Sequence, residues 1–210
     1  DIFNNSDIDV VYILTPTDTH ATFCYQAIAS RKHVMIEKPV TMSARETLQI
    51  HHAVKSTNLI AMTAFKFRFY DMIRMARSLV SHPFMASVQI MDDPWPADFW
   101  ANDPQKGGGN VISQGVHGVD LLHYCIGKKP VSVFAAGGNF HQPTGVVDNM
   151  TATYQFEGGV VGNLIVGDCG QAPVLSKFSL QLHGAPGSVL VSDRFTVLHF
   201  KPQTGNDIEK

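Results

Sequence analysis

Short apolar runs recur through the first third of the chain. After Asp9, the segment 9–14 (DVVYIL) is continuously apolar and rich in β-branched side chains, and similar runs follow at 33–37 (HVMIE) and 58–64 (NLIAMTA). Runs of this length are typical of strands that are covered on both faces, as in a parallel sheet. The pattern therefore predicts three parallel strands in this part of the chain.

Two helical segments separate these strands. Thr17 or Asp18 can serve as the N-cap of a helix that runs to about Ser30. Ser43 can cap the next helix, and Glu46 follows it three residues later, as in a capping box. The order strand, helix, strand, helix, strand with short connections predicts a doubly wound α/β unit.

The pattern changes from about residue 65. Two helices are predicted, at 71–80 (DMIRMARSLV) and at 110–127 (NVISQGVHGVDLLHYCIG), the second closed by Gly127. Apolar runs alternate with turn residues elsewhere, and FEGG is a hairpin signal between two of them. The predicted strands lie at 84–91, 130–138, 147–156, 159–167, 177–184, 187–193 and 194–200. This half is therefore expected to form an open, mostly antiparallel sheet with one or two helices on a face.

Composition narrows the class of protein. Of the 210 residues, 44% are hydrophobic and 16% are charged, a globular balance that argues against disorder. The net charge of −2 gives no basic surface for nucleic acid, and no apolar run approaches the ~20 residues of a membrane span. Three widely spaced cysteines form neither a disulfide framework nor a zinc site, so reduced thiols and a cytoplasmic location are expected. Without an H-E-x-x-H or C-x-x-C motif, no metal is expected.

Polar residues follow the first two predicted strands. The segment TPTDTH (15–20) comes directly after the first strand, and EKP (37–39) comes directly after the second. In open α/β sheets ligands bind beyond the carboxyl ends of the strands, and neighbouring strands lie ~5 Å apart. The two segments are therefore a candidate ligand site, and the alternative is a pair of ordinary solvated loops.

The predicted helix at 110–127 carries a second candidate site. Ser113, His117, Asp120 and Tyr124 are spaced so that they share one face of this helix. The stripe is either part of a site or a solvated surface with a lone histidine. Ser113, His117 and Asp120 are also the residue types of a nucleophilic triad, although no strained elbow or oxyanion hole is evident.

Two glycines and two tryptophans accompany this helix. Gly115 and Gly118 each cost roughly 1 kcal/mol relative to alanine in a helix, which indicates that something approaches the helix closely, such as a ligand or another backbone. Trp95 and Trp100 flank a long loop. They either wall a sugar-sized pocket or anchor the loop on the core.

The apolar strand with TPTDTH, the EKP segment and GGGNVISQGVHGVD together resemble the Gfo/Idh/MocA family of NAD(P)-dependent oxidoreductases of sugars, inositols and related polyols. The resemblance covers nearly the whole chain. It implies an α/β fold in which residues 1–64 form the C-terminal part of a doubly wound Rossmann domain. Residues 65–210 would form an α+β substrate and oligomerisation domain with an open, mostly antiparallel sheet. Family members often form homo-oligomers through this sheet.

The resemblance also implies roles for matching residues. Lys38 and His117 correspond to the catalytic lysine and histidine of the family, which often has a cis peptide before the following proline. The residues implied to bind the cofactor, NAD or NADP, are Thr15, Pro16, His20, Glu37, Lys38, Pro39 and Arg68. The residues expected to face the substrate are Lys38, Trp95, Trp100, Ser113, Gln114 and His117.

Two departures from the family pattern matter. The family commonly has an aspartate four residues before the histidine, where this chain has Ser113. Serine cannot carry the negative charge that would pair with Lys38 or raise the basicity of His117, so these two act alone with help from Ser113 or Gln114, or activity is weakened. The phosphate-binding G-x-G-x-x-G is also absent. We therefore expect a piece of a longer protein that binds dinucleotide poorly by itself and is inactive.

These observations predict that the parent protein transfers a hydride between NAD(P) and a sugar, inositol or related polyol, with no nucleic-acid or membrane partner. Two alternatives stay open. One is a non-catalytic member of the same fold that senses cofactor or sugar, and the other is a glycosidase that uses bound NAD.

Overall fold

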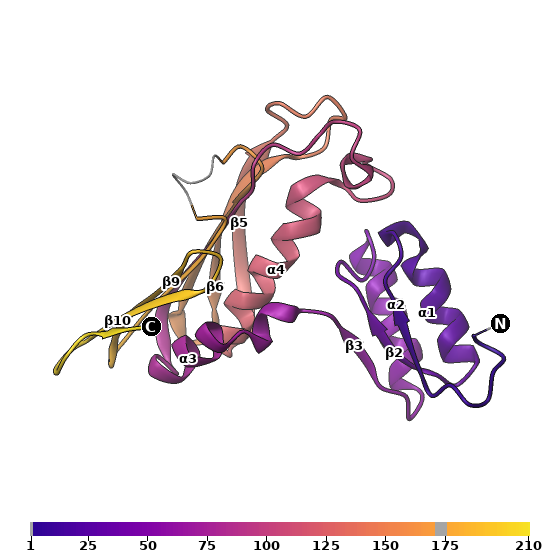
Figure 1. The fold of residues 1–210 in the computed structure, drawn as a ribbon, viewed down its shortest axis with the longest axis horizontal. Helices are drawn as coiled ribbons and strands as arrows, with labels where there is room; N and C mark the ends of the chain where they lie inside the picture. The colour runs from indigo at the N-terminus through magenta and orange to yellow at the C-terminus, as the bar shows by residue number, and fades with distance from the viewer. Residues whose placement is uncertain (1, 171–175) are drawn as a thin grey trace.

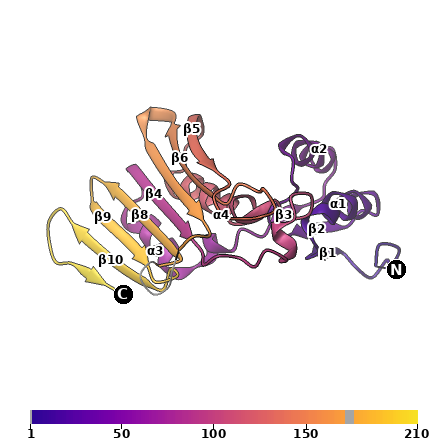
Figure 2. The same ribbon diagram turned by 90° about the horizontal axis from the view of Figure 1, so that it is seen from above.

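The computed structural model describes residues 2–170 and 176–210, which form two units. A small unit has a three-stranded sheet, and a large unit has an eight-stranded sheet with a long helix, α4, across one face (Figure 1). α4 lies on the face that is turned toward the small unit, between the two sheets (Figures 1 and 2). The described chain starts at the outer side of the small unit and ends at the far edge of the large sheet (Figure 1).

The small unit is a parallel sheet in the order β1-β2-β3. Its elements are β1 (Val10–Ile13), α1 (His20–Ala29), β2 (His33–Ile36), α2 (Ala44–Lys55) and β3 (Ala61–Thr63). Alternate strand residues, such as Val11 and Val34, pack with α1 and α2 into one core that also includes Cys24 and Ile50. The predicted β-α-β-α-β order is confirmed, with both helices on this one face.

The two predicted helix caps have different outcomes. Ser43 caps α2 as predicted, because its hydroxyl accepts a hydrogen bond from the backbone N–H of Glu46 at 3.5 Å. The predicted cap of α1 at Thr17 or Asp18 is wrong. A 3-10 turn, η1 (Thr17–Thr19), precedes α1, and the Thr19 hydroxyl instead donates to the carbonyl of Pro16 at 2.7 Å.

The large sheet has the strand order β11-β10-β9-β8-β4-β7-β6-β5. All neighbouring strands are antiparallel except β4 and β7, which are parallel, so the predicted mostly antiparallel sheet is confirmed. Its strands are β4 (Pro83–Met91), β5 (Pro130–Gly138), β6 (Asn149–Phe156), β7 (Val161–Gly167), β8 (Phe178–Gly184), β9 (Gly187–Ser192), β10 (Val197–Pro202) and β11 (Ile208–Glu209). The two-residue β11 was not predicted.

Two helices cover one face of this sheet. α3 (Asp71–Leu79) and α4 (Gly109–Ile126) bury their apolar side chains in the core, where Leu121 and Leu122 are almost fully enclosed. α4 can approach β7 closely because a Cβ at Gly118 would lie 2.4 Å from Leu164 Cδ1. The expected close approach at Gly118 is therefore confirmed, although the close neighbour is a core side chain and neither a ligand nor another backbone.

The polar stripe of α4 does not face solvent. His117 and Asp120 are buried and Ser113 and Tyr124 are half-buried, whereas Ile112 and Val119 elsewhere on the helix are more than a third exposed. The interpretation of a solvated surface stripe is therefore wrong, because this face of α4 is covered by the chain that connects the two units.

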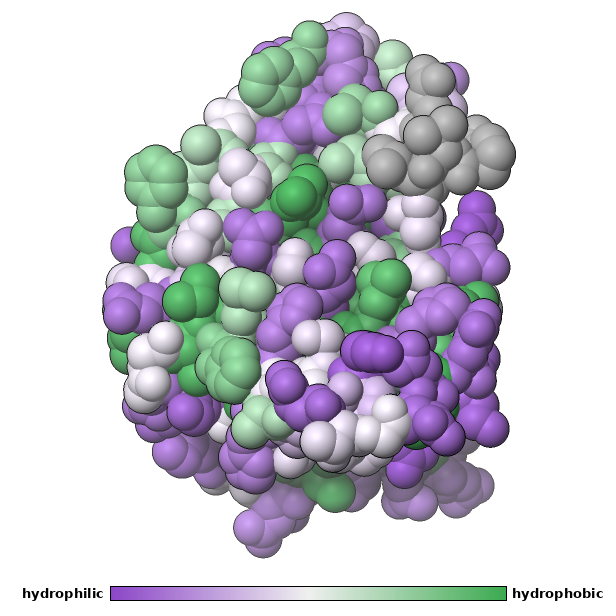
Figure 3. All heavy atoms as spheres, turned by 90° about the vertical axis from the view of Figure 1, so that its left-hand side faces the viewer, coloured by the Kyte–Doolittle hydropathy of each residue, from purple (hydrophilic) through white to green (hydrophobic). Residues whose placement is uncertain are grey.

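The other face of the large sheet carries no helix among the described residues. The strand registers place one cross-strand row on it, from Phe134 on β5 to Glu209 on β11, and Figure 3 shows this side of the molecule with hydrophobic and hydrophilic side chains intermixed. The row consists of Phe134, Thr153, Asn163, Ser87, Gln181, Leu190, His199 and Glu209. None of the described helices has the length and apolarity to span a bilayer.

Candidate active site

The two polar segments predicted at the strand ends lie side by side. β1 and β2 are parallel neighbours, with Ile13 opposite Ile36, so their carboxyl ends meet at one edge. His20 links the segments that follow: its Nδ1 lies 2.9 Å from the carbonyl oxygen of Pro39, and its Nε2 lies 2.8 Å from that of Thr15. Because the His20 ring is buried between main-chain oxygens, this residue can position the two loops.

The EKP segment aims Lys38 toward the large unit. The Lys38–Pro39 peptide bond is cis. The Nζ of Lys38 donates to the main-chain carbonyl of Ser113 in α4 at 3.0 Å, while its own backbone N–H donates to the carboxylate of Glu37 at 3.0 Å. Burial lowers the pKa of Lys38 from its ordinary value; Glu37 opposes this shift, and the charges of Lys66 and Lys177 add to it.

His117 lies one turn beyond Ser113 on α4. The ring is only 2% exposed, and it packs on two phenylalanines, with centroid distances of 4.5 Å to Phe67 and 6.1 Å to Phe65. Burial and the nearby charges of Lys38 and Lys66 lower the pKa of His117 to about 3, so the imidazole is neutral near pH 7. Within the described residues its Nδ1 has no hydrogen-bond partner. The residue is thus a buried neutral base with an unused ring nitrogen.

Arg68 connects the small unit to the same helix. It lies in the 3-10 turn η2 (Lys66–Phe69), and its Nε donates to the Asp120 carboxylate at 2.9 Å. The guanidinium also lies 5.3 Å from the ring centroid of Tyr124. Since Arg68 engages the Asp120 carboxylate, and Nδ1 of His117 is unpartnered, a Ser113–His117–Asp120 triad is not assembled.

The two tryptophans belong to the loop between β4 and α4. The indole N–H of Trp95 donates to Asp92 at 3.0 Å, and Lys177 pairs with the same carboxylate at 2.6 Å. Trp100 is 46% exposed, and Phe99 lies between the two indoles. Trp95 therefore anchors the loop, as one of the two interpretations of the sequence held.

A buried polar network under this loop was not foreseen. Asp148 and Asp168 are both fully buried. His141 and Gln142 connect them: both donate backbone N–H groups to Asp148, and their side chains lie 2.8 and 2.7 Å from the Asp168 carboxylate. Burial raises the pKa of Asp148, but the backbone amides and Asn149 outweigh this effect and bring the value to about 2. The one signal in the sequence was the position of Asp168, directly after an apolar strand.

The predicted site residues thus fall into three groups. Thr15 and Pro16 are exposed beside Glu37, Lys38 and Pro39 at the carboxyl edge of the small sheet, where a cofactor can reach them. Ser113, Gln114 and His117 lie on α4, which Lys38 contacts. His20, Arg68 and Trp95 use their polar groups within the protein. Trp100 belongs to none of these groups, because it lies exposed on the loop between β4 and α4. A groove of about 650 Å³ opens next to Pro39, between α2 and α4, with a mainly apolar lining.

Comparisons with known proteins agree with this architecture. Residues 1–65 match an oxidoreductase family described as having an NAD-binding Rossmann fold, so the class is that of Rossmann-fold oxidoreductases. Residues 73–190 match the GFO/IDH/MocA C-terminal domain. The chain belongs to the Gfo/Idh/MocA family.

The relatives are distant in sequence but close in fold. The chain is 26% identical over 200 residues to scyllo-inositol 2-dehydrogenase (NAD(+)) of Bacillus subtilis (strain 168), covering 91% of this chain and 57% of the relative. It is 25% identical over 196 residues to the uncharacterized oxidoreductase YrbE of that strain, covering 90% and 56%. A structure of levoglucosan dehydrogenase in complex with NADH and levoglucosan superposes with a TM-score of 0.89 at 23% identity, covering 100% of this chain and 62% of the other. The chain therefore spans a little over half the length of these curated relatives.

Proposed function

We propose that the protein is an NAD(P)-dependent oxidoreductase that acts on a sugar, an inositol or a related polyol. The observation that carries the proposal is the placement of Lys38, at the carboxyl edge of the parallel sheet, against the helix that holds the buried neutral His117. Sugar and inositol dehydrogenases among the relatives support the substrate class.

The residues at the carboxyl edge of the small sheet fit a nicotinamide cofactor. Thr15, Pro16 and Pro39 form the edge of the small sheet along which the cofactor would lie, and Glu37 holds the main chain of Lys38 in place. Bound NAD(P) would supply or accept the hydride. Everything else that the reaction needs, including orientation, charge stabilisation and proton movement, falls to the protein's own side chains.

Lys38 is proposed to stabilise the charge that develops on the reacting oxygen. Its ammonium group donates a hydrogen bond to the hydroxyl or carbonyl oxygen of the substrate, and the interaction strengthens as that oxygen becomes alkoxide-like. The Ser113 carbonyl fixes the position of Nζ without neutralising it, because a carbonyl carries no net charge. The full positive charge therefore remains available to the substrate.

His117 is proposed to move the proton. The neutral imidazole accepts the proton of the substrate hydroxyl during oxidation and returns it during reduction. Burial and the lysine charges keep the ring in this acceptor form, since they hold its pKa at about 3 in the free protein. The protonated ring would be stabilised only while the substrate oxygen carries negative charge, which couples proton movement to the reaction.

Single-turnover hydride transfer tests these roles in protein expressed from its full reading frame. Lys38→Ala and His117→Ala should each slow the step about 10²-fold or more, as loss of an electrostatic or acid–base group does. The matched controls are Lys55→Ala and His123→Ala, which replace exposed residues on α2 and α4. Wild-type rates in both active-site variants would refute the assignment. NAD(P) binding without turnover of any polyol would favour the non-catalytic alternative.

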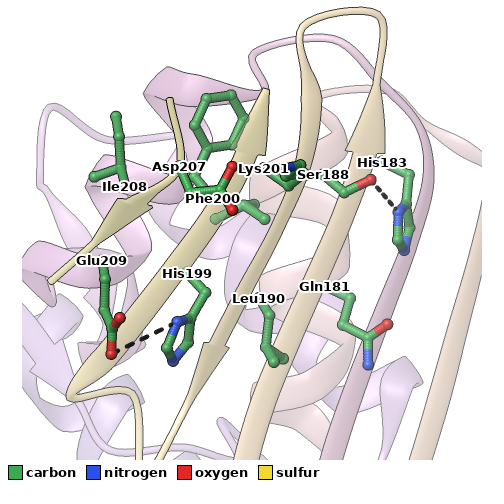
Figure 4. A pocket seen from close by; sticks show the side chains of 11 residues that line it. Gln181, His183, Ser188, Leu190, His199, Phe200, Lys201, Asp207, Ile208 and Glu209 are labelled. Carbon is green, nitrogen blue, oxygen red and sulfur yellow. Dashed lines mark hydrogen bonds and ion pairs between the residues drawn. The ribbon is translucent and has the colours of Figure 1, made fainter. Parts of the chain in front are cut away.

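We also infer that copies of the protein associate through the open face of the large sheet. Phe134 is 76% exposed there, and Met85, Val161, Ile165 and Leu190 are each at least 37% exposed. Figure 4 shows the polar part of this face, where His199 lies 3.9 Å from Glu209 and a hollow of about 380 Å³ is lined by β8 to β11. A second copy would cover both the apolar side chains and this hollow.

A further inference from the structure

Two lysines that have no direct contact with the substrate in the proposed mechanism lie next to the candidate active site. Lys66 begins η2, and its Nζ lies 5.6 Å from the ring centroid of Phe67. Lys177 directly precedes β8, and its Nζ lies 5.2 Å from the ring centroid of Phe178. The two phenylalanine rings are in edge contact, 4.9 Å apart, and the Phe67 ring also touches that of His117. Each lysine thus lies over one ring of the Phe67–Phe178 pair, which forms an aromatic floor next to His117.

Lys38, Lys66 and Lys177 all bring positive charge to this region, and the Glu37 carboxylate opposes that charge at Lys38. Lys66 lowers the pKa of both His117 and Lys38, and Lys177 also lowers that of Lys38. Lys177 is paired with Asp92, whereas no carboxylate in the described part of the chain pairs with Lys66. The nearest turn of α4 adds no acid, because it presents Ser113 and Gln114. An electrostatically incomplete site of this kind favours a ligand that brings its own negative charge.

We propose that the substrate carries an anionic group, a carboxylate or a phosphate, that binds between the ammonium groups of Lys66 and Lys177. This inference rests on the proposed function and narrows it from polyols in general to sugar acids or sugar phosphates. The two lysines come from different parts of the chain, since Lys66 lies in the connection after the small unit and Lys177 directly precedes β8 of the large sheet. The anion would therefore contact both the connection between the two units and the large unit.

The bound anion would also change the behaviour of His117. The positive field of Lys38 and Lys66 helps to keep the imidazole unprotonated, and the negative charge of the anion offsets this field. Offsetting that field raises the proton affinity of the ring only when substrate is in place. The same charge would stabilise the ammonium of Lys38, so a single substituent would prepare both groups for the reaction.

Binding of matched probes tests the proposal without requiring turnover. D-glucitol, D-gluconate and D-glucitol 6-phosphate share a six-carbon polyol chain and differ in charge. Calorimetric titration of the protein from its full reading frame, in the presence of NADH so that no polyol is oxidised, should show at least one anionic probe binding about tenfold more tightly than glucitol. The preferred anion distinguishes a carboxylate from a phosphate. Equal or weaker binding of both anions would overturn the proposal.

Variants test whether Lys66 causes the preference for an anionic probe. Lys66→Gln should weaken binding of the preferred anion about fivefold, the size expected for a partly exposed ion pair, and reduce its advantage over glucitol. Lys55→Gln, an exposed lysine on α2, is the matched control and should leave this advantage unchanged. An equal effect of both variants would overturn the proposal, as would a Lys66→Gln variant that weakens NADH binding alone. If hydride transfer fails with every probe while anion selectivity holds, the proposed function fails and the anion site stands.

Discussion

Gly118→Ala gives a direct test of how closely α4 packs on the large sheet. The added Cβ would lie 2.4 Å from Leu164 Cδ1 and 3.5 Å from Ile90 Cδ1, and both of these side chains are fully buried. Leu164 would therefore have to leave its position in a close-packed core. Gly115→Ala is the matched control on the same helix, because its Cβ would meet nothing closer than Val166 Cγ1 at 3.6 Å.

The structure sets the sign and size of each effect. Alanine is favoured over glycine in a helix interior by ~1 kcal/mol, so Gly115→Ala should raise the free energy of unfolding by about that amount. For Gly118→Ala the same gain opposes an overpacking cost of ~1–3 kcal/mol, which leaves a net loss of up to ~2 kcal/mol. The two variants should therefore differ by about 1–3 kcal/mol although the chemical change is identical.

Urea unfolding followed by near-ultraviolet circular dichroism measures this difference. A double-mutant cycle with Leu164→Val, which removes both δ-methyl groups, should recover part of the loss in Gly118→Ala. Equal stability of the two alanine variants would refute the packing argument. A cycle without coupling would show that Leu164 is not the obstacle.

Two further predictions concern the candidate site and the open sheet. The pKa of His117 is lowered to about 3 in the folded state, so its contribution to stability is complete above pH ~6.5 and is lost as the pH falls toward 3, with a slope of at most ~1.4 kcal/mol per pH unit. Unfolding of the wild type and of His117→Gln between pH 7 and 5 measures this slope. Identical pH dependences of the two proteins would contradict the prediction. Phe134→Asp should lower the molar mass measured by light scattering, whereas Val133→Asp, on the opposite face of β5, should not; an unchanged mass for Phe134→Asp would exclude association through this face.

Local patterns were sufficient for most of the fold. The run that became β8 alternates, and its apolar Leu180 and Leu182 face the core, so its periodicity already indicated which side is buried. The run that became β1 is apolar throughout, but only alternate residues are buried, so the expected cover on both faces is wrong for the described residues. Two features escaped this reasoning. β10 begins at Val197 because Asp193 to Phe195 adopt positive φ angles, which no glycine marks in the sequence. β11 is only two residues long and depends on pairing with β10, a long-range contact that no local pattern encodes.

In the candidate site, too, some residues could be placed from the sequence and others could not. Lys38 could be placed from the sequence because parallel strands end at a common edge, and His117 because helical spacing is regular. Lys66 and Lys177 could not be placed, since one lies in a 3-10 turn and the other directly before a strand far along the chain. The partner of Arg68 was also hidden, because Asp120 was read with His117 on its own helix rather than across the connection between the units.

The acceptor that holds Lys38 has a consequence for how this family can vary. The contact is made to the carbonyl of Ser113, not to its side chain. Every residue type supplies that oxygen, so position 113 can exchange one side chain for another without loosening the lysine. Comparison of aligned sequences would register such an exchange as the loss of a site residue, although the attachment point would be intact. Position 113 is therefore a place where the reaction could be retuned for new substrates by single substitutions, with the geometry of Lys38 inherited unchanged.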